Sequence, residues 1–174
     1  MLHIIMGLPG SGKSTATKLL AERLHAEVIN TDILHGLLFP QGERTETGDF
    51  TPEQLAEIYR SMRPLAYYLS KVAPESHIIF EGSFRFKSQR DFITQLLIEN
   101  GIKYQILLLE LDEKIAEERI TNRHEKEGAP DTFEDYLKIK SVFERPTAAF
   151  EIDNTGKVED LAKHLDDYIE SLQP

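Results

Sequence analysis

Near the amino terminus the chain reads Gly7-Leu8-Pro9-Gly10-Ser11-Gly12-Lys13-Ser14. This segment, the phosphate loop below, fits the pattern G-x-x-x-x-G-K-[ST] at every fixed position. Its glycines let the backbone curl so that several N–H groups point at one anion, and the following helix adds the positive end of its dipole. Lys13 can then reach the β- and γ-phosphates, and the Ser14 hydroxyl can bind Mg²⁺. The pattern predicts binding of ATP with Mg²⁺; the alternative is a glycine-rich turn with an exposed lysine.

Apolar runs of strand length alternate with segments that carry apolar residues at helical spacing. The expected strands cover residues 2–6, 27–30, 77–81, 104–109 and 149–152. The expected helices cover roughly residues 13–25, 32–38, 51–72, 88–99, 112–127, 132–144 and 158–172. This alternation predicts an α/β fold with a five-stranded, mostly parallel sheet and helices on both faces, a three-layer α/β/α arrangement. No repeat or linker interrupts it, so residues 1–174 are expected to form a single domain.

The composition limits the classes of function. Of the 174 residues, 40% are hydrophobic and 29% are charged, which is ordinary for a globular domain. The chain has no cysteine, which excludes disulfides and thiolate metal sites, and no apolar run long enough to span a membrane. A formal net charge of −10 disfavours a broad nucleic-acid surface. Because the amino terminus shows no secretory signal, we expect a cytoplasmic protein.

Polar residues end or follow several expected strands. In parallel α/β sheets, ligands bind at the carboxyl ends of the strands. Gly7, Asp32, Glu81 and Asp112 all fall at such ends, so we expect them at one edge of the sheet. Residues 39–50 are polar and contain glycine and proline, which predicts a mobile loop.

Four features follow one another along the chain: Gly7–Thr15, Asp32, Glu81-Gly82-Ser83-Phe84-Arg85, and Arg119-x-x-x-Arg123. With these features the chain resembles, over about residues 1–155, the small P-loop kinases of the nucleoside-monophosphate-kinase-like group. It is most similar to the branch of gluconate kinases, chloramphenicol phosphotransferase, zeta-toxin kinases and polynucleotide 5′-kinase domains. The resemblance implies a P-loop NTPase fold with a helical lid at about residues 119–131. It also implies an ATP site built from Gly7, Leu8, Pro9, Gly10, Ser11, Gly12, Lys13, Ser14 and Thr15.

The resemblance gives Asp32 a role at the acceptor. In this branch, an aspartate at this place hydrogen-bonds the acceptor hydroxyl and serves as its base, which suits in-line phosphoryl transfer. An aspartate here could instead cap the following helix. Many relatives have arginine three residues later, where this chain has His35; Asp32-Ile33-Leu34-His35 looks more like the D-x-L-H of gluconate kinases. Asp32 and His35 are therefore expected at the substrate.

Three further residues are expected near the metal and the substrate. Glu81 ends an apolar strand, as the metal-site carboxylate of such kinases does, and is expected to hold Mg²⁺ through water; a carboxylate in solvent is the alternative. Arg85 stands where nucleotide kinases hold the phosphate acceptor with D-G-x-P-R, although Phe84 replaces the proline. Arg90 matches a second arginine frequent in this branch. Both arginines are expected to bind an anionic substrate or, alternatively, to pair with surface acids.

Arg119 and Arg123 lie four residues apart on one helical face. In the kinases that the chain resembles, the first arginine stacks on the adenine and the second touches the transferring phosphates. Arginine suits both tasks because it is planar, always charged and bidentate. Arg123 therefore joins Lys13 and Asp32 as an expected catalytic residue, and an ordinary solvated helix is the alternative.

Together these features predict an ATP- and Mg²⁺-dependent kinase that moves the γ-phosphoryl group to a hydroxyl of a small molecule. A polynucleotide 5′-hydroxyl kinase is a second hypothesis, against which the acidic balance counts. A nucleotide-dependent regulatory ATP-binding protein is a third, and a toxin-like kinase acting on a sugar-nucleotide is a fourth. The acceptor itself is left open among sugar-like, nucleoside-like and antibiotic-like compounds.

Overall fold

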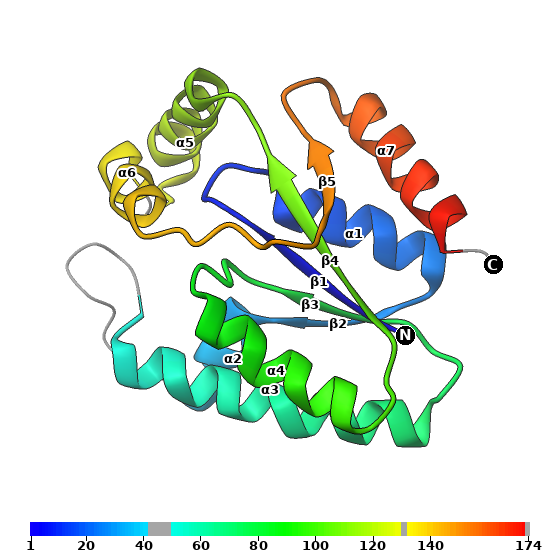
Figure 1. The fold of residues 1–174 in the computed structure, drawn as a ribbon. Coiled ribbons are helices and arrows are strands. Elements are labelled where there is room, and N and C mark those ends of the chain that lie inside the picture. Colours follow the sequence, from blue (N-terminus) through cyan, green and yellow to red (C-terminus); the bar gives the residue numbers. More distant parts are fainter. Residues whose placement is uncertain (42–49, 130–131, 173–174) are drawn as a thin grey trace.

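The computed structural model describes residues 1–41, 50–129 and 132–172, in which strands and helices alternate along the chain (Figure 1). Five strands form one sheet: β1 (Leu2–Gly7), β2 (Glu27–Asn30), β3 (Ile78–Glu81), β4 (Tyr104–Glu110) and β5 (Phe150–Asp153). Their order across the sheet is β2-β3-β1-β4-β5, and every neighbouring pair is parallel. The expected five-stranded sheet is thus confirmed, and the described strands are all parallel rather than mostly so.

The helices cover both faces of this sheet. The described residues form α1 (Lys13–Leu24), α2 (Thr31–Leu38), α3 (Pro52–Val72), α4 (Lys87–Glu99), α5 (Glu113–Glu127), α6 (Phe133–Ser141) and α7 (Val158–Ser171). Figure 1 shows α1 and α7 on one face and α3 and α4 on the other, which confirms the three-layer α/β/α architecture. None of the described helices combines the length and apolar content that a membrane span needs.

Strand β1 lies at the centre of the sheet and sends alternate side chains to two apolar cores. Leu2, Ile4 and Met6 are fully buried in the core formed with α3 and α4. Ile5 points the other way, into a cluster that includes Leu165 of α7. Because both faces are covered, β1 is apolar almost without interruption. Each such side chain contributes about 1.5–3 kcal/mol on burial, so both cores hold β1, and with it the site at its end.

Helices α5 and α6 form a pair that follows β4 (Figure 1). Ala116 and Ile120 of α5 form a third buried cluster with Tyr136 of α6, and Leu8 of the phosphate loop packs against it. This cluster ties the helix pair to the phosphate loop. The expected lid at residues 119–131 falls on the second half of α5 and the turn after it, and its motion stays a prediction. Residues 130–131, like residues 42–49 of the expected mobile loop, lie outside the described residues.

Candidate active site

The phosphate loop connects the end of β1 to the start of α1. Gly12 is the N-cap of α1 and has a φ of 85°, in the left-handed region that glycine reaches without strain. A Cβ at this position would also lie 2.2 Å from Asn154 Nδ2. Glycine is therefore required at position 12 both by the backbone conformation and by the close approach of a neighbouring side chain.

Asn154 supports the phosphate loop from the turn between β5 and α7. Its Nδ2 donates a hydrogen bond of 2.8 Å to the Ser11 carbonyl, and its backbone N–H donates one of 2.8 Å to the Glu110 carbonyl. The side chain is buried. The α1 N-cap is a glycine and makes no side-chain hydrogen bond to the helix start, as suits a helix start that binds an anion. The loop thus combines a fixed backbone with a helix start that its N-cap side chain does not block.

A cavity of about 420 Å³ opens beside the phosphate loop and is called the nucleotide cavity below. Its walls include Thr15 of α1, Arg119 and Arg123 of α5, and Asn154. Arg119 Nη2 donates a hydrogen bond of 3.3 Å to the Gly156 carbonyl in the turn before α7. The structure therefore brings Arg119 to the phosphate loop, whereas its stacking on a base stays a prediction.

Ser14 and Glu81 meet where β3 ends beside α1. Ser14 Oγ donates a hydrogen bond of 2.6 Å to Glu81 Oε1, and Glu81 is only 5% exposed. This burial argues against the alternative, in which Glu81 is a carboxylate exposed to solvent at the end of the strand. A hydroxyl and one carboxylate are hard oxygen ligands, and Mg²⁺ commonly takes one or two carboxylates while phosphates and water fill its remaining positions. The pair therefore fits a Mg²⁺ ion that arrives with the nucleotide.

Within the part of the chain that the structure describes, no metal site built from protein groups alone competes with this arrangement. The residues that the structure describes contain no group of three or more His, Cys, Asp or Glu side chains placed to hold a metal ion. A metal held by Ser14 and Glu81 would thus depend on the phosphates of the nucleotide for its other ligands.

A second hollow, called the transfer cleft below, has a volume of about 380 Å³ and is lined by charged side chains from several elements. Lys13 comes from α1, Asp32 from α2, Glu81 from β3, Arg85 from the turn after β3, and Arg123 from α5. They meet because parallel strands end at one edge of the sheet. Arg123 lines both the transfer cleft and the nucleotide cavity, so it lies where the two join.

Asp32 does not cap α2. The N-cap is Asn30, whose Oδ1 accepts hydrogen bonds from the N–H groups of Asp32 (2.7 Å) and Ile33 (3.2 Å). The carboxylate of Asp32 therefore projects from the first turn of α2, where it is exposed and lines the transfer cleft. Since Asn30 makes the capping hydrogen bonds, the alternative of Asp32 as a helix cap is wrong.

Two of the expected substrate residues are not among those that line the transfer cleft. The ring of His35 is buried and stacks on Phe50 with 4.5 Å between ring centroids. Arg90 is 4% exposed, and its Nη1 donates a hydrogen bond of 2.7 Å to the Phe84 carbonyl. His35 packs in the apolar contact between α2 and the start of α3, and Arg90 holds backbone. The described geometry thus gives neither residue the expected contact with substrate.

Arg90 fixes the turn that carries Arg85 into the transfer cleft. Phe84 in this turn has a φ of 44°, a left-handed conformation that costs a non-glycine residue of order 1 kcal/mol. The Arg90 guanidinium holds the Phe84 carbonyl, and the N–H of Glu144 donates a hydrogen bond of 2.8 Å to the Arg85 carbonyl. Burial lowers the pKa of Arg90. A buried cation is thus used to hold a strained turn beside the cleft.

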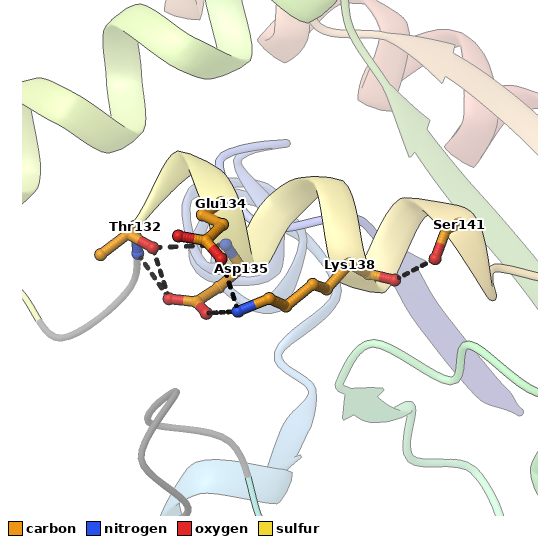
Figure 2. Close-up of polar contacts among 5 residues, drawn as sticks. All are labelled: Thr132, Glu134, Asp135, Lys138 and Ser141. Carbon is orange, nitrogen blue, oxygen red and sulfur yellow. Dashed lines mark hydrogen bonds and ion pairs between the residues drawn. The ribbon is translucent and has the colours of Figure 1, made fainter.

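Helix α6 adds charged side chains to the transfer cleft, and the motifs did not reveal them. Figure 2 shows the polar contacts of these side chains. Thr132 caps the helix and its Oγ donates a hydrogen bond of 2.6 Å to Asp135 Oδ2. Lys138 Nζ lies 3.0 Å from Glu134 Oε1 and 3.8 Å from Asp135 Oδ1. Asp135 and Lys138 both line the cleft. The only sequence signal was the T-x-x-D capping box at Thr132, which marks a helix start and not a site.

A family model described as an AAA domain (AAA_33) matches residues 2–146. The chain belongs to this family. The chain is also similar to adenylate kinases. The adenylate kinase of Micrococcus luteus is 27% identical to it over 93% of this chain and 87% of the relative. The adenylate kinase of Phocaeicola vulgatus is 28% identical over 90% of this chain and 87% of the relative. The chain is thus a kinase-like P-loop domain, and the resemblance to the nucleoside-monophosphate-kinase-like group is confirmed.

Solved structures show the same fold. The APS kinase CysC of Mycobacterium tuberculosis, in complex with AMPPNP and APS, has a TM-score of 0.69 at 21% identity and covers 97% of this chain and 96% of its own. A gluconokinase from Sinorhizobium meliloti 1021 has a TM-score of 0.68 at 18% identity, with 98% of this chain and 94% of its own covered. At these identities the likeness establishes the fold alone.

The requirement for glycine at position 12 predicts that Gly12→Ala destabilises the protein and weakens Mg·ATP binding. A left-handed alanine costs about 1–2 kcal/mol, and its Cβ would displace Asn154. Gly36→Ala in α2 is the matched control, since a Cβ there meets no atom within 4 Å. Denaturant unfolding and calorimetry with Mg·ATP measure both effects. Equal stability and equal affinity of the two variants would contradict this account of the loop.

The role of Arg90 predicts a loss of stability in Arg90→Met. The variant leaves the Phe84 carbonyl without its donor inside the protein, which costs about 1–3 kcal/mol. Lys87→Met on the same helix removes only an exposed ion pair with Asp91 and should change stability by less than about 0.5 kcal/mol. Denaturant unfolding of both variants makes the comparison. A loss in Lys87→Met as large as that in Arg90→Met would refute the role given to Arg90.

Proposed function

We propose that this P-loop kinase transfers the γ-phosphoryl group of Mg·ATP to a hydroxyl group of a small molecule. The proposal is carried by the exposed carboxylate of Asp32, which lines the same cleft as Lys13 of the phosphate loop. A hydroxyl acceptor must lose its proton on phosphorylation, and an accessible carboxylate can take it. The acceptor oxygen then forms the new bond to the γ-phosphorus. The bond from that phosphorus to the β–γ bridging oxygen breaks, ADP leaves, and the proton goes to Asp32.

The nucleotide cavity and the transfer cleft bind different parts of the reacting molecules. The nucleotide cavity, with Arg119 and Asn154 on its walls, takes the base and sugar. Lys13 Nζ donates a hydrogen bond of 3.0 Å to the Leu8 carbonyl, which keeps the ammonium on the phosphate loop where the β- and γ-phosphates would lie. Arg123 lines both hollows, so its guanidinium can contact the γ-phosphoryl group throughout the transfer from ATP to the acceptor. Preorganised cations of this kind stabilise the charge of the transition state.

Ser14 and Glu81 are the residues that would hold Mg²⁺, Glu81 through a bound water. When bound, Mg²⁺ neutralises charge on the β- and γ-phosphate oxygens. Glu81 is buried, and its carboxylate accepts the hydrogen bond of the Ser14 hydroxyl. Glu81 and Asp32 therefore have separate tasks although both line the cleft.

A phosphate acceptor, as in nucleotide kinases, is the second candidate. It is favoured by the sequence similarity to adenylate kinases and by Arg85 in the transfer cleft. Such an acceptor needs cations but no base, and a carboxylate near the reacting oxygen would repel it. Asp32 exposes its carboxylate in this cleft. This carboxylate therefore supports a hydroxyl acceptor over an anionic one.

Replacing the proposed base separates the two candidates. Asp32→Asn keeps the size of the side chain and removes the proton acceptor, so kcat with a hydroxyl acceptor should fall about 10²- to 10⁴-fold. Mg·ATP affinity should be unchanged, because Asp32 lines the transfer cleft and not the nucleotide cavity. Asp91→Asn, at an exposed position of α4, is the control. ADP release is measured over a panel of alcohols and nucleoside monophosphates. Wild-type turnover of the best acceptor by Asp32→Asn would sink the base assignment.

Lys138 is the cation of α6 in the transfer cleft. Its hydrogen bond to Glu134 raises the pKa of Lys138, so the side chain stays charged at neutral pH. The side chain is about half exposed, at 53%, which leaves the ammonium accessible to a ligand in the cleft. We therefore assign Lys138 to the transferring phosphoryl group or to the acceptor, and not to the base and sugar of the nucleotide.

This assignment predicts that Lys138→Ala lowers kcat/KM for the acceptor by about tenfold or more, the loss of one charge-assisted hydrogen bond. The Kd for Mg·ADP should not change. Lys140→Ala is the matched control on the same helix, because Lys140 pairs with Glu113 and lines a different cavity. Steady-state kinetics with the best acceptor and ADP titration make the comparison. An equal effect of both substitutions would show that only the charge of α6 matters.

A further inference from the structure

Beside the transfer cleft lies a mainly apolar hollow, called the annex below, with a volume of about 530 Å³. The transfer cleft is lined by many charged groups. By contrast, seven of the eleven residues that line the annex are apolar or aromatic: Phe50, Pro52, Leu55, Ala56, Tyr59, Phe86 and Phe92. They come from the start of α3, the turn after β3 and the start of α4. Its size falls within the range of about 300–1,000 Å³ that is usual for small-molecule sites.

The annex and the transfer cleft adjoin each other. Phe50, Leu55, Tyr59, Arg85 and Phe86 line both of them. A molecule whose reacting group lies in the cleft can therefore extend its remainder toward the annex. This shared wall points to the acceptor, and not to the nucleotide, as the occupant, since none of these five residues lines the nucleotide cavity.

Polar groups of the annex are already partly engaged. Gln89 Oε1 accepts a hydrogen bond of 3.1 Å from the Phe86 N–H, in the capping box of α4. Arg60 Nη1 donates a hydrogen bond of 2.8 Å to Glu57 Oε2 on the same exposed face of α3. The Arg63 guanidinium lies over the Phe92 ring, 4.8 Å from its centroid. Arg85, Ser88 and the Tyr59 hydroxyl are the other polar groups of a wall that is otherwise apolar.

We propose that the annex binds an apolar, ring-sized body of the acceptor, so that the substrate class is an amphipathic alcohol. Its hydroxyl lies at Asp32, and its aromatic or alicyclic part lies between the rings of the annex. The proposal rests on the phosphoryl transfer proposed above and names the acceptor of that site. A linear polyol such as a sugar acid is disfavoured, because hydroxyl groups that face the apolar and aromatic part of the wall would lose water without gaining partners.

The experiment compares matched probes that share hydroxyl groups and differ in the ring. Phenyl glucoside is paired with glucose, and adenosine with ribose, and the nucleotide cavity is first filled with Mg·ADP so that adenosine cannot bind there. Saturation-transfer NMR and titration give the affinity and show which protons of each probe touch the protein. We expect the ring-bearing member of at least one pair to bind about tenfold tighter or more, with its ring protons in contact.

A substitution tests where the ring lies. Ala56 lines the annex but not the transfer cleft and is exposed on α3, so Ala56→Leu fills the annex without entering the cleft. We expect it to weaken the ring-bearing probe about tenfold and to leave glucose, ribose and Mg·ADP unchanged. Lys71→Leu, at an exposed position of the same helix that lines neither hollow, is the control.

The outcomes are distinct. Equal binding of both members of each pair, no binding by any ring-bearing probe, or equal effects of Ala56→Leu and Lys71→Leu would overturn the proposal. Self-association that Ala56→Leu abolishes would assign the annex to a second copy of the chain and would also overturn it. Ring-dependent binding that Ala56→Leu weakens, without phosphoryl transfer to any probe, would support the annex and count against the proposed function instead.

Discussion

The hydrogen bond from Asn154 to the Ser11 carbonyl holds the peptide on which the site depends. It joins positions 143 residues apart and lies in the interior, so it fixes the phosphate loop to the far edge of the sheet. The bond is possible only because Gly12 has no side chain and has a left-handed backbone. With the loop fixed in this way, no N-cap side chain blocks the start of α1. Lys13 and Ser14 lie in the first turn of this helix, beside the strand ends. The strand ends then bring Glu81 to the Ser14 hydroxyl.

The charge distribution explains how an acidic chain can accept a polyphosphate. The formal net charge is −10, but Lys13, Arg123 and Lys138 line one cleft of about 380 Å³. Inside such a cleft, local cations outweigh the field of distant surface acids, which water and salt screen. The carboxylates in the cleft differ in environment: Glu81 is buried against a hydroxyl, whereas Asp32 is exposed. Under the proposed function, Glu81 and Asp32 can therefore hold the metal and take the proton without competing.

The parts that sequence alone anticipated are those whose conformation is locally encoded. The glycine pattern of the phosphate loop and the alternation of strands and helices are short-range signals, and the fold followed from them. His35 and Arg90 were placed by resemblance, yet their burial depends on how α2 packs on α3 and on a strained turn at Phe84. Lys138 lies four residues after Glu134, so the sequence of α6 looks like that of any solvated helix. Only the tertiary fold places Lys138 at the cleft.

The proposed nucleotide half and the proposed acceptor half of the site are built from different parts of the protein. This difference bears on which acceptor the chain would phosphorylate. The nucleotide half uses backbone donors and strand-end residues, which the P-loop architecture fixes. The proposed acceptor half uses side chains of α3, the start of α4 and α6, and the turn that Arg90 secures, which lie outside the G-x-x-x-x-G-K-S segment itself. If the annex holds the acceptor as proposed, substitutions at Phe50 or Phe92 change the acceptor while ATP binding is preserved. For this reason a shared fold with a gluconokinase or an APS kinase does not transfer their substrates to this chain. The apolar rings beside its own cleft are the better guide to the acceptor.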